Sequence, residues 1–323
     1  MKDKLLLLIN NFKEKKVLVI GDIMLDKYVF GKVTRVSPEA PVPIVKVEKE
    51  SYVPGGAANA ASNITNLGAQ AFLVGVVGED QERGTLLNEL RVRKIKTEGI
   101  VMDDTRPTIQ KTRVLSRNQQ LLRVDYEKSH KTTDAIENKL ISYLQRLIPE
   151  VDIIIISDYA KGLITSNLMD EVKKLAKKYN KRVIVDPRPI NKELYKDVYL
   201  ITPNASEAEK LAKEDANTDE EFKELSKTLA TSFNSNIIIT RGPKGMLLFE
   251  NGNSISMPTK AIDVYDVSGA GDTVVSALSL ALAAGASLEE AATLANHAAG
   301  VVVGKLGTAT CSLDELKESI NND

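Results

Sequence analysis

The sequence predicts an α/β protein with a mostly parallel central sheet covered by helices, together with a small inserted β-layer. Two observations predict the sheet. Short apolar segments alternate with helix-forming segments, as they do in βαβ units. Their apolar residues also run continuously, which is typical of strands buried on both faces. We expect these strands at residues 17–20, 72–77, 153–157, 183–186, 199–202 and 237–240.

Two segments, about 26–48 and 106–127, instead alternate apolar and polar residues, as strands with one solvent-exposed face do. We expect them to form the β-layer, which would act as a lid on a single domain spanning residues 1–323. The alternative is two long surface loops, but unstructured loops of about 20 residues are uncommon.

The chain has 323 residues and a composition typical of globular proteins. Its net charge is −1, so it has no excess of basic residues to bind nucleic acid. A single cysteine, Cys311, and two distant histidines exclude an intrachain disulfide and a Cys- or His-rich metal centre. No apolar run reaches the roughly 18 residues of a membrane span, and the run at 5–9 is too short for a secretory signal. We therefore expect a cytoplasmic protein.

Polar residues follow most of the predicted strands, among them Asp22, Asp158, Asp186, Asn204 and the Arg241-Gly242 pair. In open α/β sheets, ligands bind beyond the carboxyl ends of the strands. The pattern therefore predicts an active site along this edge.

A small-residue turn at 268–271 is the most informative motif. We expect a short strand ending at Asp266 before it and a long helix reaching about Ala284 after it. Gly269 and Gly271 let backbone amides approach a ligand, and the following helix N-terminus favours a phosphate. Asp272, in the first helical turn, could accept a proton from an attacking hydroxyl.

The alternative interpretation is a glycine-rich turn with Asp272 as a helix cap. The motif is not a dinucleotide fingerprint, because Val274 occupies the third glycine position. Residues 300–306 are not a Walker A loop either, because no Ser or Thr follows Lys305, and we interpret them as a helix end.

Two further motifs strengthen the functional interpretation of Asp272. Gly55 and Gly56 open a predicted helix that carries Asn59. Asn204 and Glu207 lie three residues apart at a strand tip, a spacing that suits hydrated Mg²⁺ beside nucleotide phosphates. The sequence alone favours the alternative, a helix capping box.

These motifs, in this order, resemble those of the ribokinase-type carbohydrate kinases over nearly the whole chain. The Gly-Gly…Asn segment and Asp-x-x-Gly-Ala-Gly-Asp are the two family signatures. The resemblance implies ATP and Mg²⁺ as cofactors and Asp272 as the catalytic base. It further implies an anion hole at Gly269, Ala270 and Gly271, nucleotide and Mg²⁺ contacts at Asn204, Ala205, Ser206 and Glu207, and sugar contacts at Asp26, Gly55, Gly56 and Asn59.

Segments 21–28, 35–43, 115–120, 157–162 and 303–308 resemble the heptose-7-phosphate kinases of that family. This implies phosphorylation of D-glycero-β-D-manno-heptose 7-phosphate at O1, towards ADP-heptose for lipopolysaccharide. Such kinases are often joined to a nucleotidylyltransferase half, whose His-x-x-His motif does not occur here, so we expect that half to be missing from this chain. The alternatives are another sugar kinase of this type and a non-catalytic sugar-binding regulator.

Several charged or polar residues are candidates for the remaining contacts. Lys161 and Arg188 follow strand tips, where they could hold the 7-phosphate, and Asp186 could bind a sugar hydroxyl; the alternative for the two cations is solvated surface charge. Weaker candidates are Arg113, Arg117 and Arg123. We expect Arg241, Gly242 and Asn296 on the nucleotide side, and a packing role for His297.

The β-layer has an apolar face that one thin sheet cannot bury alone. We therefore expect a homodimer formed through the layer, because two-fold pairing is the commonest way to cover such a patch. The apolar residues are Val42, Ile44, Val45, Val47, Leu115, Leu121, Leu122 and Val124.

Overall fold

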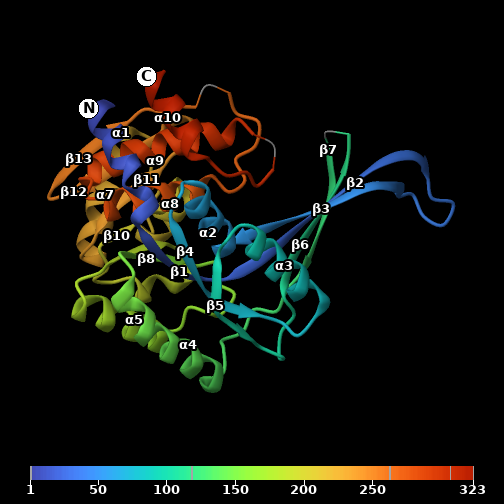
Figure 1. Ribbon diagram of the computed structural model, residues 1–323. Coiled ribbons are helices and arrows are strands. Elements are labelled where there is room, and N and C mark those ends of the chain that lie inside the picture. Colours follow the sequence, from blue (N-terminus) through green and yellow to red (C-terminus); the bar gives the residue numbers. More distant parts are fainter. Residues whose placement is uncertain (1, 118, 262, 306, 323) are drawn as a thin grey trace.

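The structure is a computed structural model that describes residues 2–117, 119–261, 263–305 and 307–322. Its main body is a nine-stranded sheet in the order β13-β12-β11-β10-β9-β8-β1-β4-β5, parallel from β11 through to β5 (Figure 1). The strands are β1 Lys16–Gly21, β4 Gln70–Val77, β5 Lys96–Met102, β8 Ile153–Ser157, β9 Arg182–Asp186, β10 Leu200–Ile201, β11 Asn236–Thr240, β12 Met246–Glu250 and β13 Asn253–Met257.

All six predicted strands are present, and the predicted mostly parallel sheet is confirmed. The three strands that the sequence did not predict, β5, β12 and β13, occupy the two ends of the sheet. The end strands β5 and β13 carry polar residues with partly exposed side chains, so they lack the continuous apolar run that marks the central strands.

Helices cover both faces of this sheet because successive strand residues point to opposite sides. In β1, Val17 and Val19 belong to one hydrophobic core, whereas Leu18 and Ile20 belong to the other. The first core is covered by α1 Lys2–Asn10, α2 Ala57–Asn66, α3 Gln81–Val92, α8 Ala270–Ala283, α9 Leu288–Val303 and α10 Leu313–Asn321, and the second by α4 Asp134–Leu147, α5 Ser166–Lys178, α6 Ala205–Ala212 and α7 Asp219–Phe233.

Short 3₁₀ helices complete the main body: η1 Phe12–Glu14, η2 Ile148–Glu150, η3 Pro189–Leu194 and η4 Gly242–Lys244. Among the described residues, no helix is long and apolar enough to pass through a lipid bilayer.

A second sheet projects from the main body (Figure 1). It contains β2 Ile23–Val36, β3 Pro43–Gly56, β6 Ile109–Ser116 and β7 Gln119–Tyr126 in the order β3-β2-β6-β7. The two alternating segments of the sequence thus form strands rather than loops. We call this element the small sheet.

The predicted strand ending at Asp266 is wrong. Residues 263–267 pair with no strand, and the amides of Tyr265 and Asp266 instead donate to the Val303 carbonyl at the end of α9. The reason is positional: the sheet ends at β13, so no neighbouring strand is available to this segment. Residues 260–261 and 263–266, which we call the crossing segment, lie against the end of α9, and Lys260 and Ala261 contact that helix at Gly300.

We expect Gly300→Ala to lower the thermal unfolding temperature. A Cβ at this position would lie 2.9 Å from the Lys260 carbonyl and 3.0 Å from the Ala261 nitrogen, so the crossing segment would have to move. Gly304→Ala is the matched control, because its Cβ would meet nothing closer than 3.5 Å and alanine favours helices. Equal unfolding temperatures for the two variants would contradict this packing.

Candidate active site

The candidate site lies at the carboxyl ends of the central strands. From β1 the sheet continues through β4 to β5 on one side and through β8 to β13 on the other, so β1 and β8 flank the point where the strand order reverses. Ligands bind at such points in open α/β sheets. Asp22 follows β1 here, and Asp158 follows β8; both side chains are buried.

Asp272 is buried in the first turn of α8, where both of its carboxylate oxygens are held. Its Oδ2 accepts a hydrogen bond from Asn59 Nδ2 at 2.8 Å, and its Oδ1 accepts one from the Tyr159 hydroxyl at 2.8 Å. Burial raises the pKa of Asp272 from its ordinary 3.8 to about 6, although these two hydrogen bonds lower it. Such a carboxylate is charged at neutral pH and basic enough to take a proton.

The turn before α8 presents backbone N–H groups beside this carboxylate. Gly269 caps the helix with φ +80°, a conformation that favours glycine. The N–H of Ala270 donates to the Val267 carbonyl, whereas those of Gly271 and Asp272 have no acceptor within hydrogen-bonding distance in the described ranges. A Cβ at Gly271 would meet nothing within 4 Å, so this amide borders open space. The arrangement suits an anion.

Tyr159 is a site residue that the motif analysis missed. Its backbone N–H donates to Asp22 Oδ2 at 3.0 Å, and the Lys161 N–H donates to the same oxygen at 3.1 Å. Asp22 therefore fixes the loop that carries the Tyr159 hydroxyl to Asp272. Burial raises the pKa of Asp22 to about 6. The polar end of β8 was the available signal, because Tyr159 stands next to Asp158 there.

Asp26, on β2, lies close enough to Asp272 for the two charges to interact. Its Oδ1 pairs with Arg113 of β6 at 2.6 Å, and its Oδ2 lies 3.4 Å from the Thr308 hydroxyl. A Cβ at Gly55 would lie 2.6 Å from Asp26 Oδ2, so only glycine lets the carboxylate sit over this backbone. The structure thus brings together the predicted sugar-side residues Asp26, Gly55, Gly56 and Asn59.

Asn204 and Glu207 form the capping box of α6. Asn204 Oδ1 accepts from the Glu207 N–H, and Glu207 Oε2 accepts from the Asn204 N–H, both at 3.0 Å. Glu207 Oε1 pairs with Arg188 at 2.6 Å, and the Arg188 guanidinium lies 4.8 Å from the Tyr159 ring centre. Burial, together with the nearby carboxylates of Asp272 and Glu207, raises the pKa of Asp186 well above its ordinary value. This cluster is therefore contiguous with Asp272.

A cleft of about 330 Å³ adjoins the turn before α8. Gly242 and Asn296, both predicted on the nucleotide side, line it together with Ala270 and Gly271. The Arg241 side chain is not brought to this cleft. It is buried against Asp219 at 2.7 Å and lies over the Phe222 ring, where it ties η4 to the start of α7.

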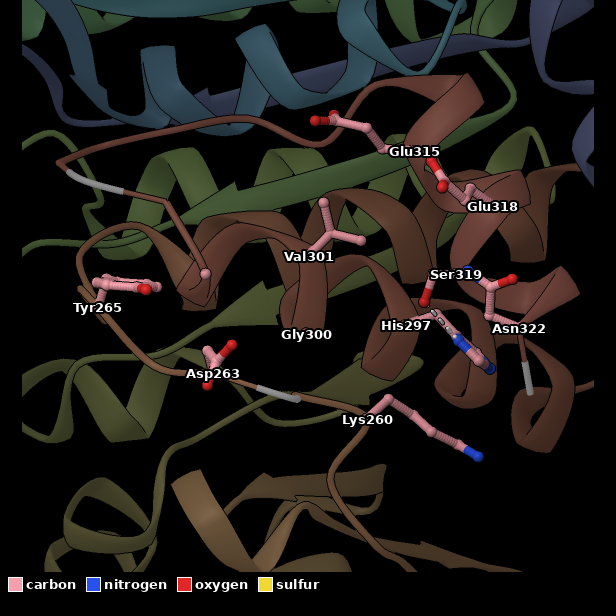
Figure 2. A pocket seen from close by; sticks show the side chains of 11 residues that line it. Lys260, Asp263, Tyr265, His297, Gly300, Val301, Glu315, Glu318, Ser319 and Asn322 are labelled. Atoms are coloured by element: carbon pink, nitrogen blue, oxygen red, sulfur yellow. Dashed lines mark hydrogen bonds between the residues drawn. The ribbon is translucent and has the colours of Figure 1, made fainter.

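Another pocket, of about 460 Å³, lies between α9, α10 and the crossing segment, and no residue named above as a catalytic candidate lines it. Figure 2 shows His297 in this pocket beside Ser319, whose hydroxyl lies 2.9 Å from its Nδ1. His297 is buried, as a packing residue would be.

The remaining predicted cations have different partners. Lys161 pairs with Glu127 at 2.6 Å, whereas Arg188 pairs with Glu207. Arg123 is exposed and pairs with Asp125, and Arg117 is exposed between β6 and β7. Arg113, the third of the weaker candidates, contacts the predicted sugar residue Asp26.

Solved structures that share this fold include two kinases. Arabidopsis thaliana ribokinase in complex with ribose and ATP aligns over 95% of this chain and 98% of its own, with a TM-score of 0.74 and 21% identity. Escherichia coli phosphofructokinase-2 with substrates and products aligns over 95% and 99%, with a TM-score of 0.78 and 20% identity. The chain therefore has the ribokinase-like α/β fold.

Sequence comparison gives the family. Residues 14–315 match the description "pfkB family carbohydrate kinase", and the chain belongs to this family of carbohydrate kinases. It is 42% identical over 316 residues to the "Bifunctional protein HldE" of Desulfatibacillum aliphaticivorans and 44% identical over 313 residues to that of Vibrio atlanticus. Each alignment covers 96% of this chain but 64% of the relative, so the chain spans under two thirds of their length.

The raised pKa of Asp272 predicts a cost to stability at neutral pH. The folded protein holds this proton more tightly than the unfolded chain, so the stability it contributes is full below pH 4 and is lost as the pH rises through about 6. A shift of about two units corresponds to roughly 3 kcal/mol. We expect Asp272→Asn to raise the thermal unfolding temperature at pH 8, with a gain that shrinks towards pH 4.

Asp219→Asn is the control, because Arg241 lowers the pKa of this exposed carboxylate. It should bring no gain at pH 8. An Asp272→Asn variant that unfolds at or below the wild-type temperature at pH 8 would show that burying this carboxylate costs nothing.

Proposed function

We propose that this chain transfers the γ-phosphoryl group of ATP to O1 of D-glycero-β-D-manno-heptose 7-phosphate, a step towards ADP-heptose. The observation that carries the proposal is the buried Asp272 carboxylate, held by Asn59 and Tyr159 beside the unpaired amide of Gly271. The choice of sugar rests on the five segments that resemble heptose-7-phosphate kinases and on the relatives named HldE.

In this mechanism Asp272 takes the proton of the anomeric hydroxyl as O1 attacks phosphorus. The O1–P bond forms, the bond from the γ-phosphorus to the ADP oxygen breaks, and the proton ends on Asp272. The N–H groups of Gly271 and Asp272 would stabilise the charge on the moving phosphoryl group. Asn59 Oδ1 is buried and has no partner among the described residues, so it is an acceptor for a sugar hydroxyl.

Arg188 is better placed for the phosphoryl group than for the 7-phosphate. It lies between Glu207 and the Tyr159 ring, on the side of the site that faces the predicted nucleotide residues. A planar guanidinium suits a phosphoryl group with several oxygens. We therefore assign Arg188 to the transferring group.

Mg²⁺ fits this site only through water. Both oxygens of Glu207 are already engaged, by Arg188 and by the Asn204 N–H, and the described residues hold no cluster of three or more His, Cys, Asp or Glu side chains suited to a metal. Asn204 and Glu207 would thus hold the water shell of a cation carried by the nucleotide phosphates. When bound, the cation would neutralise phosphate charge.

The proposal is tested by incubating the purified protein with ATP and heptose 7-phosphate and measuring ADP and sugar 1,7-bisphosphate. We expect both products in equal amounts. Asp272→Asn should lower kcat by about 10²–10⁴ while nucleotide binding persists, because it removes the general base. Asp219→Asn, which alters the ion pair with Arg241 outside the cleft, should keep wild-type turnover.

Turnover of another sugar, with none of heptose 7-phosphate, would contradict the proposed substrate but not the kinase activity. Near wild-type turnover by Asp272→Asn would contradict the role of Asp272 as general base. Binding of sugar and ATP with no turnover of any sugar would favour a non-catalytic regulator.

We also propose that the small sheet forms a homodimer interface. Leu122, Val124 and Tyr126 alternate along β7 and are 48%, 38% and 56% exposed. The strand register places them on the face opposite to Asp125, whose partners across the sheet are Lys111 and then Asp26. This apolar face therefore points away from the site, and a second copy could cover it.

A Leu122→Glu, Val124→Glu variant should sediment as a monomer with weakened sugar affinity and unchanged nucleotide binding. Leu7→Glu is the control, because Leu7 is also exposed but lies on α1. Sedimentation of the wild-type protein as a monomer at micromolar concentration would overturn the dimer.

A further inference from the structure

The backbone of Lys161 is fixed on both sides by buried charged residues. Its N–H donates to Asp22 Oδ2 at 3.1 Å, and its carbonyl accepts from Arg106 Nη1 at 2.9 Å. Arg106 is 4% exposed, pairs with Asp103 at 2.6 Å and also donates to the His130 carbonyl. Two buried charged residues from different parts of the chain thus hold this loop lysine in place.

The Lys161 side chain shares a carboxylate with a second lysine. Its ammonium lies 2.6 Å from Glu127 Oε1, while Lys111 lies 3.5 Å from Glu127 Oε2 and 3.4 Å from Asp125. The side chains of Lys161, Lys111 and Glu127 are 18%, 17% and 25% exposed. They are therefore screened from bulk water yet open to a ligand.

The lysine pair belongs to the sugar side of the site. Lys111 is the register partner of Asp26 in the β2–β6 pairing, so both side chains lie on the same face of the small sheet. Arg113, two residues further along β6, lies on that face as well and contacts Asp26. Asp26 in turn interacts with the charge of Asp272.

The charges around the two lysines favour an anion. Lys111, Lys161 and Arg113 face the carboxylates of Asp26 and Glu127, and the Arg123–Asp125 pair adds no net charge. A phosphate offers more oxygen atoms than Glu127 and a charge near −2, so it can bind both ammonium groups at once. Glu127 serves as the counter-ion of the two lysines until the phosphate binds.

We infer that Lys161 and Lys111 bind the phosphate group that the sugar substrate already carries, and that this phosphate displaces the Glu127 carboxylate from the two ammonium groups. The inference deepens the proposed function, on which it rests for the identity of the sugar phosphate. It separates Lys161 from Arg188, which lies on the nucleotide side. It also adds Lys111, which the sequence did not single out.

The experiment measures equilibrium binding of heptose 7-phosphate and of the unphosphorylated heptose, without ATP, to four variants. Lys161→Met and Lys111→Met should each weaken binding of the sugar phosphate roughly 10- to 100-fold and leave binding of the heptose unchanged. Glu127→Gln should bind the sugar phosphate at least as tightly as the wild type, because it frees both lysines. Lys32→Met, which removes an exposed pair with Glu48 elsewhere on the small sheet, should change neither affinity.

A purely structural role for the cluster predicts that Lys161→Met and Glu127→Gln weaken both ligands alike. That result, or an unchanged ratio of the two affinities in both lysine variants, would overturn the inference. Inorganic phosphate separates this outcome from failure of the proposed function. If the wild type does not bind heptose 7-phosphate but binds inorganic phosphate, and Lys161→Met loses that binding, the result supports the lysine site and contradicts the proposed substrate.

Discussion

The site is organised around the contact between α2 and α8, which allows a charged carboxylate to sit in a nearly dry place. Asn59 of α2 reaches Asp272 because the two helices pack against each other, and both helices contain small, fully buried residues, among them Ala60, Ala61 and Ala277. The Ser276 hydroxyl donates to the Ala60 carbonyl, so the register between the helices is also fixed by hydrogen bonds. A bulkier residue at this contact would separate the carboxylate from the amide that stabilises its charge.

Most carboxylates of the site have a partner that offsets their charge. Three of them are each matched with one cation, Asp26 with Arg113, Glu207 with Arg188 and Glu127 with Lys161, whereas Asp272 is held by two neutral hydrogen-bond donors. An incoming phosphate or hydroxyl therefore exchanges one polar partner for another and leaves no charge bare. Because removing one partner of a half-buried pair leaves the other uncompensated, these pairs also constrain which substitutions the fold tolerates.

The small sheet has two different faces, and each has its own chemistry. The face with Asp26, Lys111 and Arg113 is charged and borders Asp272, whereas the face with Leu122 and Val124 is apolar and exposed. Tyr28 connects the charged face to the loop after α9. Its hydroxyl forms a hydrogen bond with the Thr308 hydroxyl and accepts another from the Thr308 backbone N–H. A single four-stranded element thereby combines a ligand surface with a surface suited to a second protein chain.

Local patterns in the sequence determined the central strands of the sheet and the start of the helix that carries Asp272. Continuous apolar runs identified the six central strands, and the spacing of glycines placed Gly269 and Asp272 at the start of α8, because both signals depend on residues close together in the chain. A separation of three residues identified the Asn204–Glu207 pair, in which the capping box and the ion pair with Arg188 coexist.

Only the tertiary structure decided which distant side chains meet. Tyr159 and Asp272 are 113 residues apart, and Asp26 and Arg113 are 87 apart, so no periodicity links them. Arg241 turned to Asp219 rather than to the nucleotide side, and the segment before the turn failed to form a strand because the sheet had already ended. Contacts of this kind depend on how helices and strands from distant parts of the chain pack together. Local propensities depend only on neighbouring residues, so they do not determine that packing.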